Sequence, residues 1–192
     1  MSENTLIEHI KTYVSLEEEE LIAIPSFFDS KTYKKKEILL QADKKTDQLF
    51  FVVKGCLHLY FIDDLGNQKT TQFAMEKWWL TDFLAFQNQQ KSNFYIEAIE
   101  NTEVLSITFS SYQQLLQQFP KMEKYFRAIY ETAYGSALMR LKYINSLSKE
   151  EMFVMFRDNF SGFVQRVPQY LLASFLGLTP EYLSEIKRKH LS

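Results

Sequence analysis

The sequence predicts an α+β protein: an N-terminal double-stranded β-helix, or jelly-roll barrel, with flanking helices, followed by a long helix and a small helical C-terminal domain. Aromatic residues make up 16% of the 192 residues, with 17 Phe and 11 Tyr, and both residue types favour strands. Between residues 31 and 110, short apolar runs alternate with turn sequences at roughly 10-residue intervals. From Ser110 onward, apolar residues recur every three or four positions, which is the period of a helix.

The bulk composition limits the class of protein. Hydrophobic residues make up 46% of the chain and charged residues 24%, which predicts a packed core. The single cysteine, Cys56, cannot form an intramolecular disulfide and favours a reducing compartment. The sequence shows neither a signal-peptide pattern nor an apolar run of membrane-spanning length, so we expect a cytoplasmic protein without a membrane partner. A net charge of −2 requires that any nucleic-acid binding depend on a local basic patch.

The barrel region begins after two short N-terminal helices within residues 3–30. The second of these is predicted to open with a capping box at Ser15–Glu18 and to stop near Pro25. Turn sequences such as Lys54-Gly55 separate the apolar runs that follow. An antiparallel barrel of about eight strands is the natural interpretation. The runs are Ile38–Leu40, Leu49–Val53, Leu57–Ile62, Gln68–Phe73, Tyr95–Ile99 and Val104–Phe109.

A long helix is predicted over residues 119–147, where the apolar residues after Pro120 form one stripe with no further proline. Two interpretations stay open. The helix could pack on the barrel, or it could pair with its copy in a homodimer, because small residues on it allow close approach. The dimer contacts that we predict are Phe126, Ile129, Ala133, Ala137 and Leu141.

Residues 169–188 have the spacing of a helix-turn-helix. Ala173 is small where two crossing helices approach, and Gly177 tolerates the positive φ of the turn. Thr179 suits the N-cap of the second helix and Pro180 its first turn. The inward positions are all apolar, namely Leu172, Leu176, Leu178, Leu183 and Ile186. An ordinary helical hairpin is the alternative.

In a helix-turn-helix the second helix enters the DNA major groove, so its outward residues are candidates for contacts with bases and phosphates. A carboxylate accepts a hydrogen bond from cytosine, and arginine pairs with guanine or phosphate. The basic end at Lys187–His190 suits phosphates, although it could also be a solvated helix end favoured by the helix dipole. The predicted DNA-binding residues are Gln169, Thr179, Pro180, Glu181, Tyr182, Ser184, Glu185, Lys187 and Arg188.

This order of parts resembles the Crp/Fnr family of transcription regulators. The resemblance covers nearly the whole chain and is most specific at Phe50–Tyr60, with Val53-Lys54-Gly55, and from Arg166 to Ser184, where it is similar to a subgroup found in Bacteroidetes-type bacteria. It implies a cyclic-nucleotide-binding-like sensor domain at residues 1–118, a dimerisation helix at 119–147 and a DNA-binding domain at 148–192. The implied function is effector-gated, homodimeric binding to palindromic double-stranded DNA, with RNA polymerase as a further candidate partner.

The same resemblance locates a tentative effector pocket. Cyclic-nucleotide-binding members use a Gly-Glu pair and an Arg-Ser/Thr pair, and the corresponding positions here are Thr81-Asp82 and Ser92-Asn93. The phosphate-binding arginine is missing, and Lys91 would lie one residue out of register. We therefore predict no cofactor and an effector other than cyclic AMP, while aromatic residues could either line a ligand site or fill the barrel. The tentative pocket comprises Trp79, Thr81, Asp82, Phe83, Lys91, Ser92, Asn93 and Tyr95.

Two further departures bear on DNA binding. The recognition helix of the family often carries Arg where this chain has Glu185, and we expect no C-terminal β-hairpin wing after Ser192. The alternative function is a protein-interaction or small-ligand-binding module that binds little DNA. The three histidines, His9, His58 and His190, lack a metal-ligand spacing, and we expect neither a metal site nor catalysis.

Overall fold

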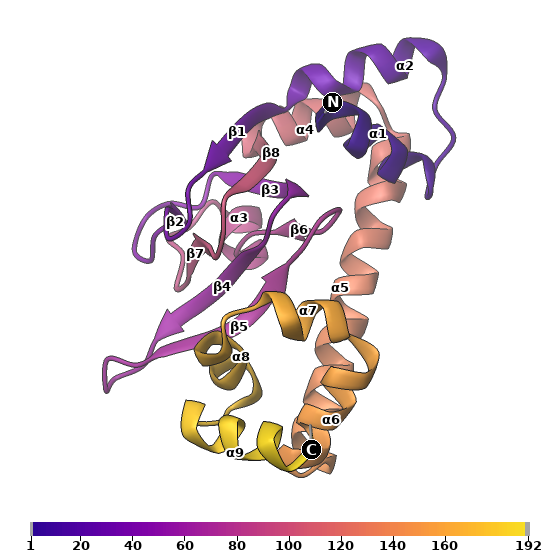
Figure 1. Ribbon diagram of the computed structural model, residues 1–192. Helices are drawn as coiled ribbons and strands as arrows, with labels where there is room; N and C mark the ends of the chain where they lie inside the picture. The colour runs from indigo at the N-terminus through magenta and orange to yellow at the C-terminus, as the bar shows by residue number, and fades with distance from the viewer. Residues whose placement is uncertain (1, 191–192) are drawn as a thin grey trace. The chain divides into compact units, whose positions relative to one another are not determined.

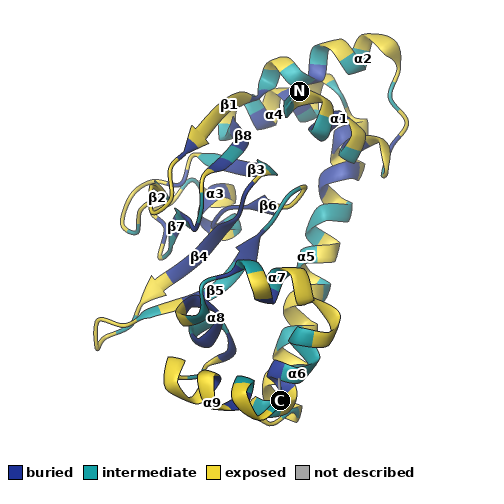
Figure 2. Cartoon of the chain, in the orientation of Figure 1, coloured by how far each residue is buried: buried dark blue, intermediate teal, exposed yellow. Residues whose placement is uncertain are grey.

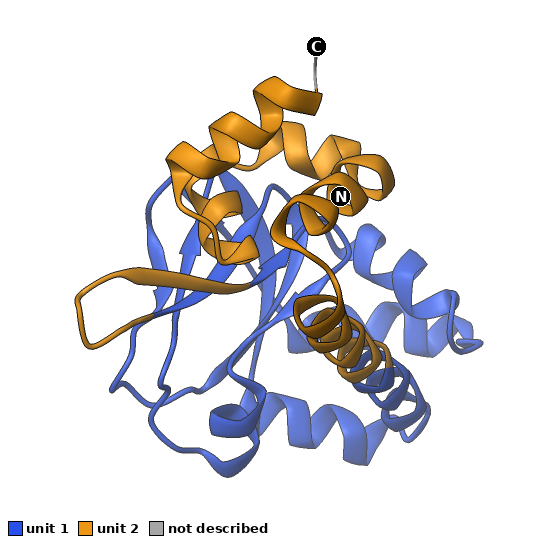
Figure 3. Ribbon diagram, turned by 90° about the horizontal axis from the view of Figure 1, so that it is seen from below, with its two compact units in different colours: residues 1–61, 72–131 blue, residues 62–71, 132–192 orange. Residues whose placement is uncertain are grey.

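The computed structural model describes residues 2–190 and divides the chain into two compact units (Figure 3). Unit 1 comprises residues 1–61 and 72–131, and unit 2 comprises residues 62–71 and 132–192. The boundary at 131–132 falls inside the long helix that the sequence predicts over 119–147. Unit 2 also takes in the tip of a hairpin whose strands begin and end in unit 1.

Two antiparallel four-stranded sheets confirm the jelly-roll prediction (Figure 1). One sheet has the strand order β1-β8-β3-β6 and the other β2-β7-β4-β5. Neighbouring strands in the first sheet come from distant parts of the sequence, since Asp29 of β1 lies opposite Ser106 of β8. The strands are β1 Asp29–Tyr33, β2 Ile38–Leu40, β3 Gln48–Lys54, β4 Leu57–Ile62, β5 Gln68–Ala74, β6 Trp79–Leu80, β7 Tyr95–Ala98 and β8 Thr102–Thr108.

The continuous apolar run in β3 is explained by burial on both of its faces. Successive side chains of a strand point to opposite faces. Phe50 and Val52 pack in a core with residues of both sheets, such as Leu57 and Val104. Leu49 and Phe51 pack in a second core with side chains from the helices, which include Leu6, Ile10, Leu115 and Tyr125.

The predicted N-terminal cap of the second helix, α2, is two residues too early. The capping box at the start of α2 joins Glu17 and Glu20 instead of beginning at Ser15. The capping box begins at Glu17 because the carboxylate of Glu20 accepts a hydrogen bond from the backbone amide of Glu17 at 2.7 Å. The elements are α1 Ser2–Lys11, α2 Glu18–Ala23, a 3-10 helix at Ile24–Phe27, α3 Phe83–Asn88 and α4 Phe109–Gln118.

Unit 2 is helical apart from the hairpin segment 62–71. The long helix α5 (Lys121–Ser146) crosses from unit 1 into unit 2, and its second half is largely exposed (Figure 2). Helix α6 (Lys149–Asn159) opens with the capping box of Ser148 and Glu151. Three more helices follow: α7 (Ser161–Arg166), α8 (Gln169–Leu176) and α9 (Pro180–His190). Within residues 2–190, no helix combines the length and apolar character that crossing a membrane requires.

Candidate nucleic-acid interface and effector pocket

Helices α8 and α9 form the tight helical pair that the spacing predicts. Gly177 ends α8 in the left-handed region at φ 67°, where a glycine avoids the steric cost of a Cβ. The amide of Leu178 donates to the carbonyl oxygen of Ala173 at 2.8 Å and closes the turn. Ala173 and Leu183 are fully buried between the helices, and Ile186 is nearly so. These contacts fix the geometry of the pair from inside.

The residues predicted to read DNA lie on the outside of this pair. Thr179 caps α9, since its hydroxyl accepts a hydrogen bond from the amide of Tyr182 at 3.2 Å. Gln169 and Lys187 are half-buried. The other candidates are exposed, namely Thr179, Pro180, Glu181, Tyr182, Ser184, Glu185 and Arg188. The whole predicted set therefore lies on α9, at the Thr179 cap before it, or at the start of α8.

Ser184 has a structural partner on each side of its hydroxyl. It donates to the carbonyl oxygen of Pro180 at 2.9 Å, and Gln169 donates to it at 2.6 Å. The Gln169 contact ties the first turn of α8 to the middle of α9, 15 residues later. Because the hydroxyl already donates once and accepts once, it has no proton left to donate to a ligand. Its role is to hold the exposed face of α9 in place.

The basic end of α9 is partly neutralised by α6. The Glu150 carboxylate accepts from Lys189 at 2.8 Å and lies 2.5 Å from His190 Nε2. Hydrogen bonds from Lys189 and His190 lower the pKa of Glu150. Residues 148–190 carry six lysines and arginines against five acidic residues, a net charge of +1. The net positive charge that this region offers to a polyanion is therefore small.

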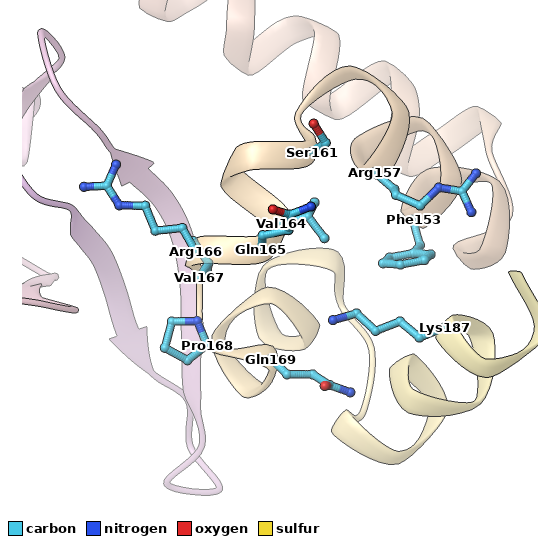
Figure 4. A pocket seen from close by; sticks show the side chains of 10 residues that line it. All are labelled: Phe153, Arg157, Ser161, Val164, Gln165, Arg166, Val167, Pro168, Gln169 and Lys187. Carbon is cyan, nitrogen blue, oxygen red and sulfur yellow. The ribbon is translucent and has the colours of Figure 1, made fainter. Parts of the chain in front are cut away.

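A pocket of about 490 Å³ lies among α6, α7, α8 and α9 (Figure 4). Figure 4 shows Lys187 reaching from α9 into this pocket, while the guanidinium of Arg166 points away from it. The lining residues include three cations and no carboxylate. They are Phe153, Arg157, Ser161, Val164, Gln165, Arg166, Val167, Pro168, Gln169 and Lys187.

Within unit 2, the hairpin strand β5 is bonded to α8 and α5 through side chains. The Ser174 hydroxyl accepts from the Thr70 amide at 3.0 Å and donates to the carbonyl oxygen of Gln68 at 2.9 Å. Arg140 of α5 donates to the carbonyl oxygens of Thr71 and Phe175. Because β5 is the last strand of its sheet, these side chains satisfy backbone groups that a neighbouring strand would otherwise bind. Sequence patterns gave no signal for these contacts.

The residues predicted for a dimer interface fall into two groups along α5. The prediction that Phe126 contacts a second chain is wrong. Phe126 is buried inside unit 1, with its ring 4.8 Å from that of Tyr112. Ile129 is partly buried against the same core, and Ala133 is half-buried. Ala137 and Leu141 are exposed. Exposed apolar residues continue along the helix at Tyr134, Leu138, Met139 and Ile144.

The tentative effector pocket centres on Asp82, whose carboxylate is fully engaged. One oxygen accepts from the Ala85 amide at 3.1 Å and so caps α3. The other accepts from the Ser92 hydroxyl at 2.9 Å and lies 3.4 Å from the Asn93 amide nitrogen. Asp82 and Ser92 are both buried. The two segments that the resemblance pairs therefore do lie side by side, but their polar groups bind one another.

The remaining pocket candidates are core or surface residues. Trp79 packs in the helical core and donates to the Tyr125 hydroxyl at 2.7 Å. Phe83 lies 5.2 Å from the ring of Tyr130, and Tyr95 stacks on Tyr60 at 5.1 Å. The Thr81 hydroxyl donates to the Gln48 carbonyl at 2.8 Å, whereas Lys91 and Asn93 are exposed. The core between the two sheets is filled mainly by aliphatic side chains, such as Leu57, Ile96 and Val104. A cyclic phosphate would meet the Asp82 carboxylate at the start of α3 instead of a cation. These residues do not fit a cyclic nucleotide.

Comparison with known proteins agrees with this architecture. The family model described as the cyclic nucleotide-binding domain matches residues 30–119. The regulator described as cAMP-activated global transcriptional regulator CRP, in Salmonella typhimurium and Escherichia coli O157:H7, is 23% identical over 88 residues. That alignment covers 46% of this chain and 42% of the CRP chain, so it spans less than half the length of those relatives.

Solved structures extend the likeness to both units. FixK2 from Bradyrhizobium japonicum matches with a TM-score of 0.74 and 16% identity, covering 84% of this chain and 83% of its own. The c-di-GMP responsive global regulator CLP from Xanthomonas campestris matches with a TM-score of 0.70 and 14% identity, covering 85% and 86%. Residues 30–119 are therefore similar to the cyclic nucleotide-binding domain, and the fold of the chain is similar to that of FixK2, of CLP and of a Crp/Fnr-family protein from Eubacterium rectale.

Proposed function

We propose that this chain is a homodimeric, DNA-binding transcription regulator of the Crp/Fnr type, acting at palindromic promoter sites. The observation that carries the proposal is the exposed face of α9, which is held in place by the buried contacts of Ala173, Leu183 and Ile186 and by the Gln169–Ser184 hydrogen bond. A helix presented in this way fits the major groove of DNA. The regulatory role of the CRP relatives supports the same function.

Dimerisation is supported by the spacing of apolar residues on α5. Tyr130, Tyr134, Ala137, Leu141 and Ile144 are separated by four, three, four and three residues, the repeat of a two-helix coiled coil. Tyr134, Leu141 and Ile144 are exposed in the single chain. Pairing of this seam with a second copy would cover them and place two α9 helices on half-sites about one DNA turn, roughly 34 Å, apart.

The effector that we propose is not a cyclic nucleotide. The Asp82 carboxylate caps α3 and binds Ser92, and buried apolar side chains such as Leu57 and Val104 occupy the core between the two sheets. Gating would instead depend on another ligand or a protein partner that binds one of two orientations of α9 more tightly than the other.

Binding to DNA is the test of the proposal. Purified dimer should retain a subset of genomic fragments at low salt, and Arg188→Ala should weaken that binding and lower the slope of log affinity against log salt by about 1. Lys142→Ala, which removes an exposed cation from α5, is the matched control and should leave the slope unchanged. Absence of fragment binding by a folded dimer at low salt contradicts the proposal.

One observation favours a second function, that of a protein-interaction module. The exposed face of α9 carries the carboxylates of Glu181 and Glu185, and residues 148–190 have a net charge of only +1. Carboxylates repel DNA phosphates but suit a basic protein surface. Stoichiometric recovery of a protein partner, together with no retention of DNA fragments, would favour this alternative.

A further inference from the structure

The exposed face of α9 presents two carboxylates one helical turn apart. Leu183 and Ile186 point into the helix pair and are buried, whereas Glu181 and Glu185 are exposed. Residues four positions apart lie on the same side of a helix. Whatever contacts this face therefore meets two hydrogen-bond acceptors.

Glu185 forms no ion pair with the cation of its own helix, Lys189, whose pKa is raised mainly by its hydrogen bond to Glu150 and to a smaller extent by the charge of Glu185. Lys189 lies one turn after it, and a Glu followed by Lys at this spacing is the favourable orientation for an ion pair within a helix. Lys189 instead donates to Glu150 of α6 at 2.8 Å, and His190 binds the same carboxylate oxygen. Across residues 2–190 of the structure, no cation lies within 4.0 Å of the Glu185 carboxylate.

The neighbouring side chain does not take over the role of reading a base. The Ser184 hydroxyl is engaged by Gln169 and by the Pro180 carbonyl. The polar group left free in the middle of α9 is therefore an acceptor only.

We propose that Glu185 selects cytosine in the DNA half-site, and that Glu150 is a positioning residue that keeps Glu185 available by holding Lys189. This inference rests on the proposed DNA-binding function. In the major groove, cytosine presents an amino donor, whereas guanine and thymine present acceptors at the equivalent positions and adenine places an acceptor beside its donor. A carboxylate that is not paired with a cation is attracted to the amino group of cytosine and is repelled by the acceptor atoms of guanine, thymine and adenine. Pairing of Glu185 with Lys189 would weaken this discrimination, because the lysine would satisfy the carboxylate and offer donors of its own.

Selection of bound sequences from a randomised double-stranded library tests the inference. The unmodified dimer should enrich cytosine about tenfold at one position of each half-site. Glu185→Gln should shift that position toward adenine, which an amide contacts through one donor and one acceptor, and should leave the other positions unchanged. Retention of cytosine at that position by Glu185→Gln overturns the role of Glu185.

Glu150→Gln separates positioning from general electrostatics. The substitution removes one negative charge, so affinity for all sequences should rise, while the preference for cytosine should fall at least threefold because Lys189 becomes free to pair with Glu185. Asp158→Asn removes a charge from the same helix, where Asp158 pairs with Arg157 at 2.7 Å, and should raise affinity without changing the preference. An unchanged preference in Glu150→Gln overturns the role of Glu150. If the unmodified dimer enriches no sequence, the proposed DNA-binding function itself fails. If it enriches a consensus that lacks the predicted cytosine, only the inference about Glu185 fails.

Discussion

The Arg140 guanidinium donates a hydrogen bond to the carbonyl oxygen of Phe175 at 2.9 Å and lies 4.2 Å from the centre of that residue's ring. The same guanidinium also donates to the carbonyl oxygen of Thr71. Burial lowers the pKa of Arg140, yet the group stays charged because arginine titrates far above neutral pH. One side chain of α5 thus joins the hairpin strand β5 to the first helix of the helix-turn-helix.

Arg140→Ala should destabilise the protein by about 2–4 kcal/mol. The loss combines two carbonyl groups left without their charged donor and a lost cation–π contact. Arg140→Lys should recover only part of the loss, because one ammonium cannot reproduce the planar fork that reaches both carbonyls. Urea unfolding gives the free energy, and hydrogen exchange should show faster exchange at residues 62–71. Arg127→Ala is the control, since Arg127 forms only an exposed ion pair with Glu131 at 3.8 Å.

Local spacing was sufficient to predict the helix-turn-helix. The positive φ of Gly177, the small Ala173 and the buried Leu183 are all requirements of one short segment, so they can be inferred from the order of residue types. The bond between Ser174 and Thr70 joins residues 104 positions apart. No periodicity contains that information, because the contact depends on how two separately folded segments meet.

Helix α7 shows a different limit of sequence analysis. Phe160-Ser161-Gly162 predicts a break, and α6 does end at Asn159, but a new short helix begins already at Ser161. Val164 is buried and the ring of Phe163 lies 6.5 Å from that of Phe175. Tertiary packing of this kind overrides the weak helix propensity of glycine and serine. Similarly, the resemblance assigned Asp82 and Ser92 to one tentative effector pocket, but the sequence could not show that their side chains bind one another.

Gly55→Ala should cost about 2–4 kcal/mol of stability. Gly55 has φ 107°, and a Cβ there would lie 2.5 Å from Thr102 Oγ1 and 2.6 Å from Thr102 Cα, so both backbone strain and overlap follow. Gly135→Ala is the matched control, because a Cβ at Gly135 meets nothing within 4 Å and alanine favours a helix by about 1 kcal/mol. Chemical denaturation of both variants checks the prediction, and equal stabilities would contradict it.

Acidification should destabilise the fold through His58. Burial lowers the pKa of His58 from 6.5 to about 4, so at pH 7 the imidazole is neutral and its 3.7 Å contact with Glu97 is not an ion pair. Between these values the unfolded chain binds the proton more readily than the folded chain. The contribution of His58 is therefore complete above pH 6.5 and is lost as the pH falls toward 4, by up to about 3 kcal/mol.

His58→Phe is the variant that isolates this contribution, since the ring stacks on Tyr60 at 4.8 Å and an aromatic replacement keeps that contact. Burial raises the pKa of Glu97, which acts in the opposite direction because its protonated form is favoured in the folded state. Subtracting the pH-dependent stability of His58→Phe from that of the unmodified protein removes the contributions of groups that both proteins share. Thermal unfolding from pH 7 to pH 4 should show a shallower decline in the variant, and parallel curves would refute the assignment.

Cyclic nucleotides should leave the melting temperature unchanged. Addition of millimolar cyclic AMP or cyclic GMP should give no shift, because a ligand that does not bind the folded state cannot stabilise it. Asp82→Ala should cost about 2 kcal/mol, since α3 loses its N-cap and the buried Ser92 hydroxyl loses its acceptor. Asp64→Ala, at an exposed hairpin position, is the control. A saturable rise in melting temperature with either nucleotide would show that the barrel opens to admit it.

Leu141→Asp should convert the protein to a monomer. Leu141 is 56% exposed in the single chain and lies in the middle of the coiled-coil seam, where pairing with the copy would bury a carboxylate opposite its equivalent. The monomer should also bind a palindromic site more weakly, because one α9 helix loses the effective concentration that its partner provides. Sedimentation equilibrium measures the mass. Leu65→Asp makes the same change at a leucine that is 86% exposed on the hairpin tip, outside the seam, and should leave the dimer intact. If Leu65→Asp rather than Leu141→Asp dissociates the dimer, the hairpin and not α5 forms the interface.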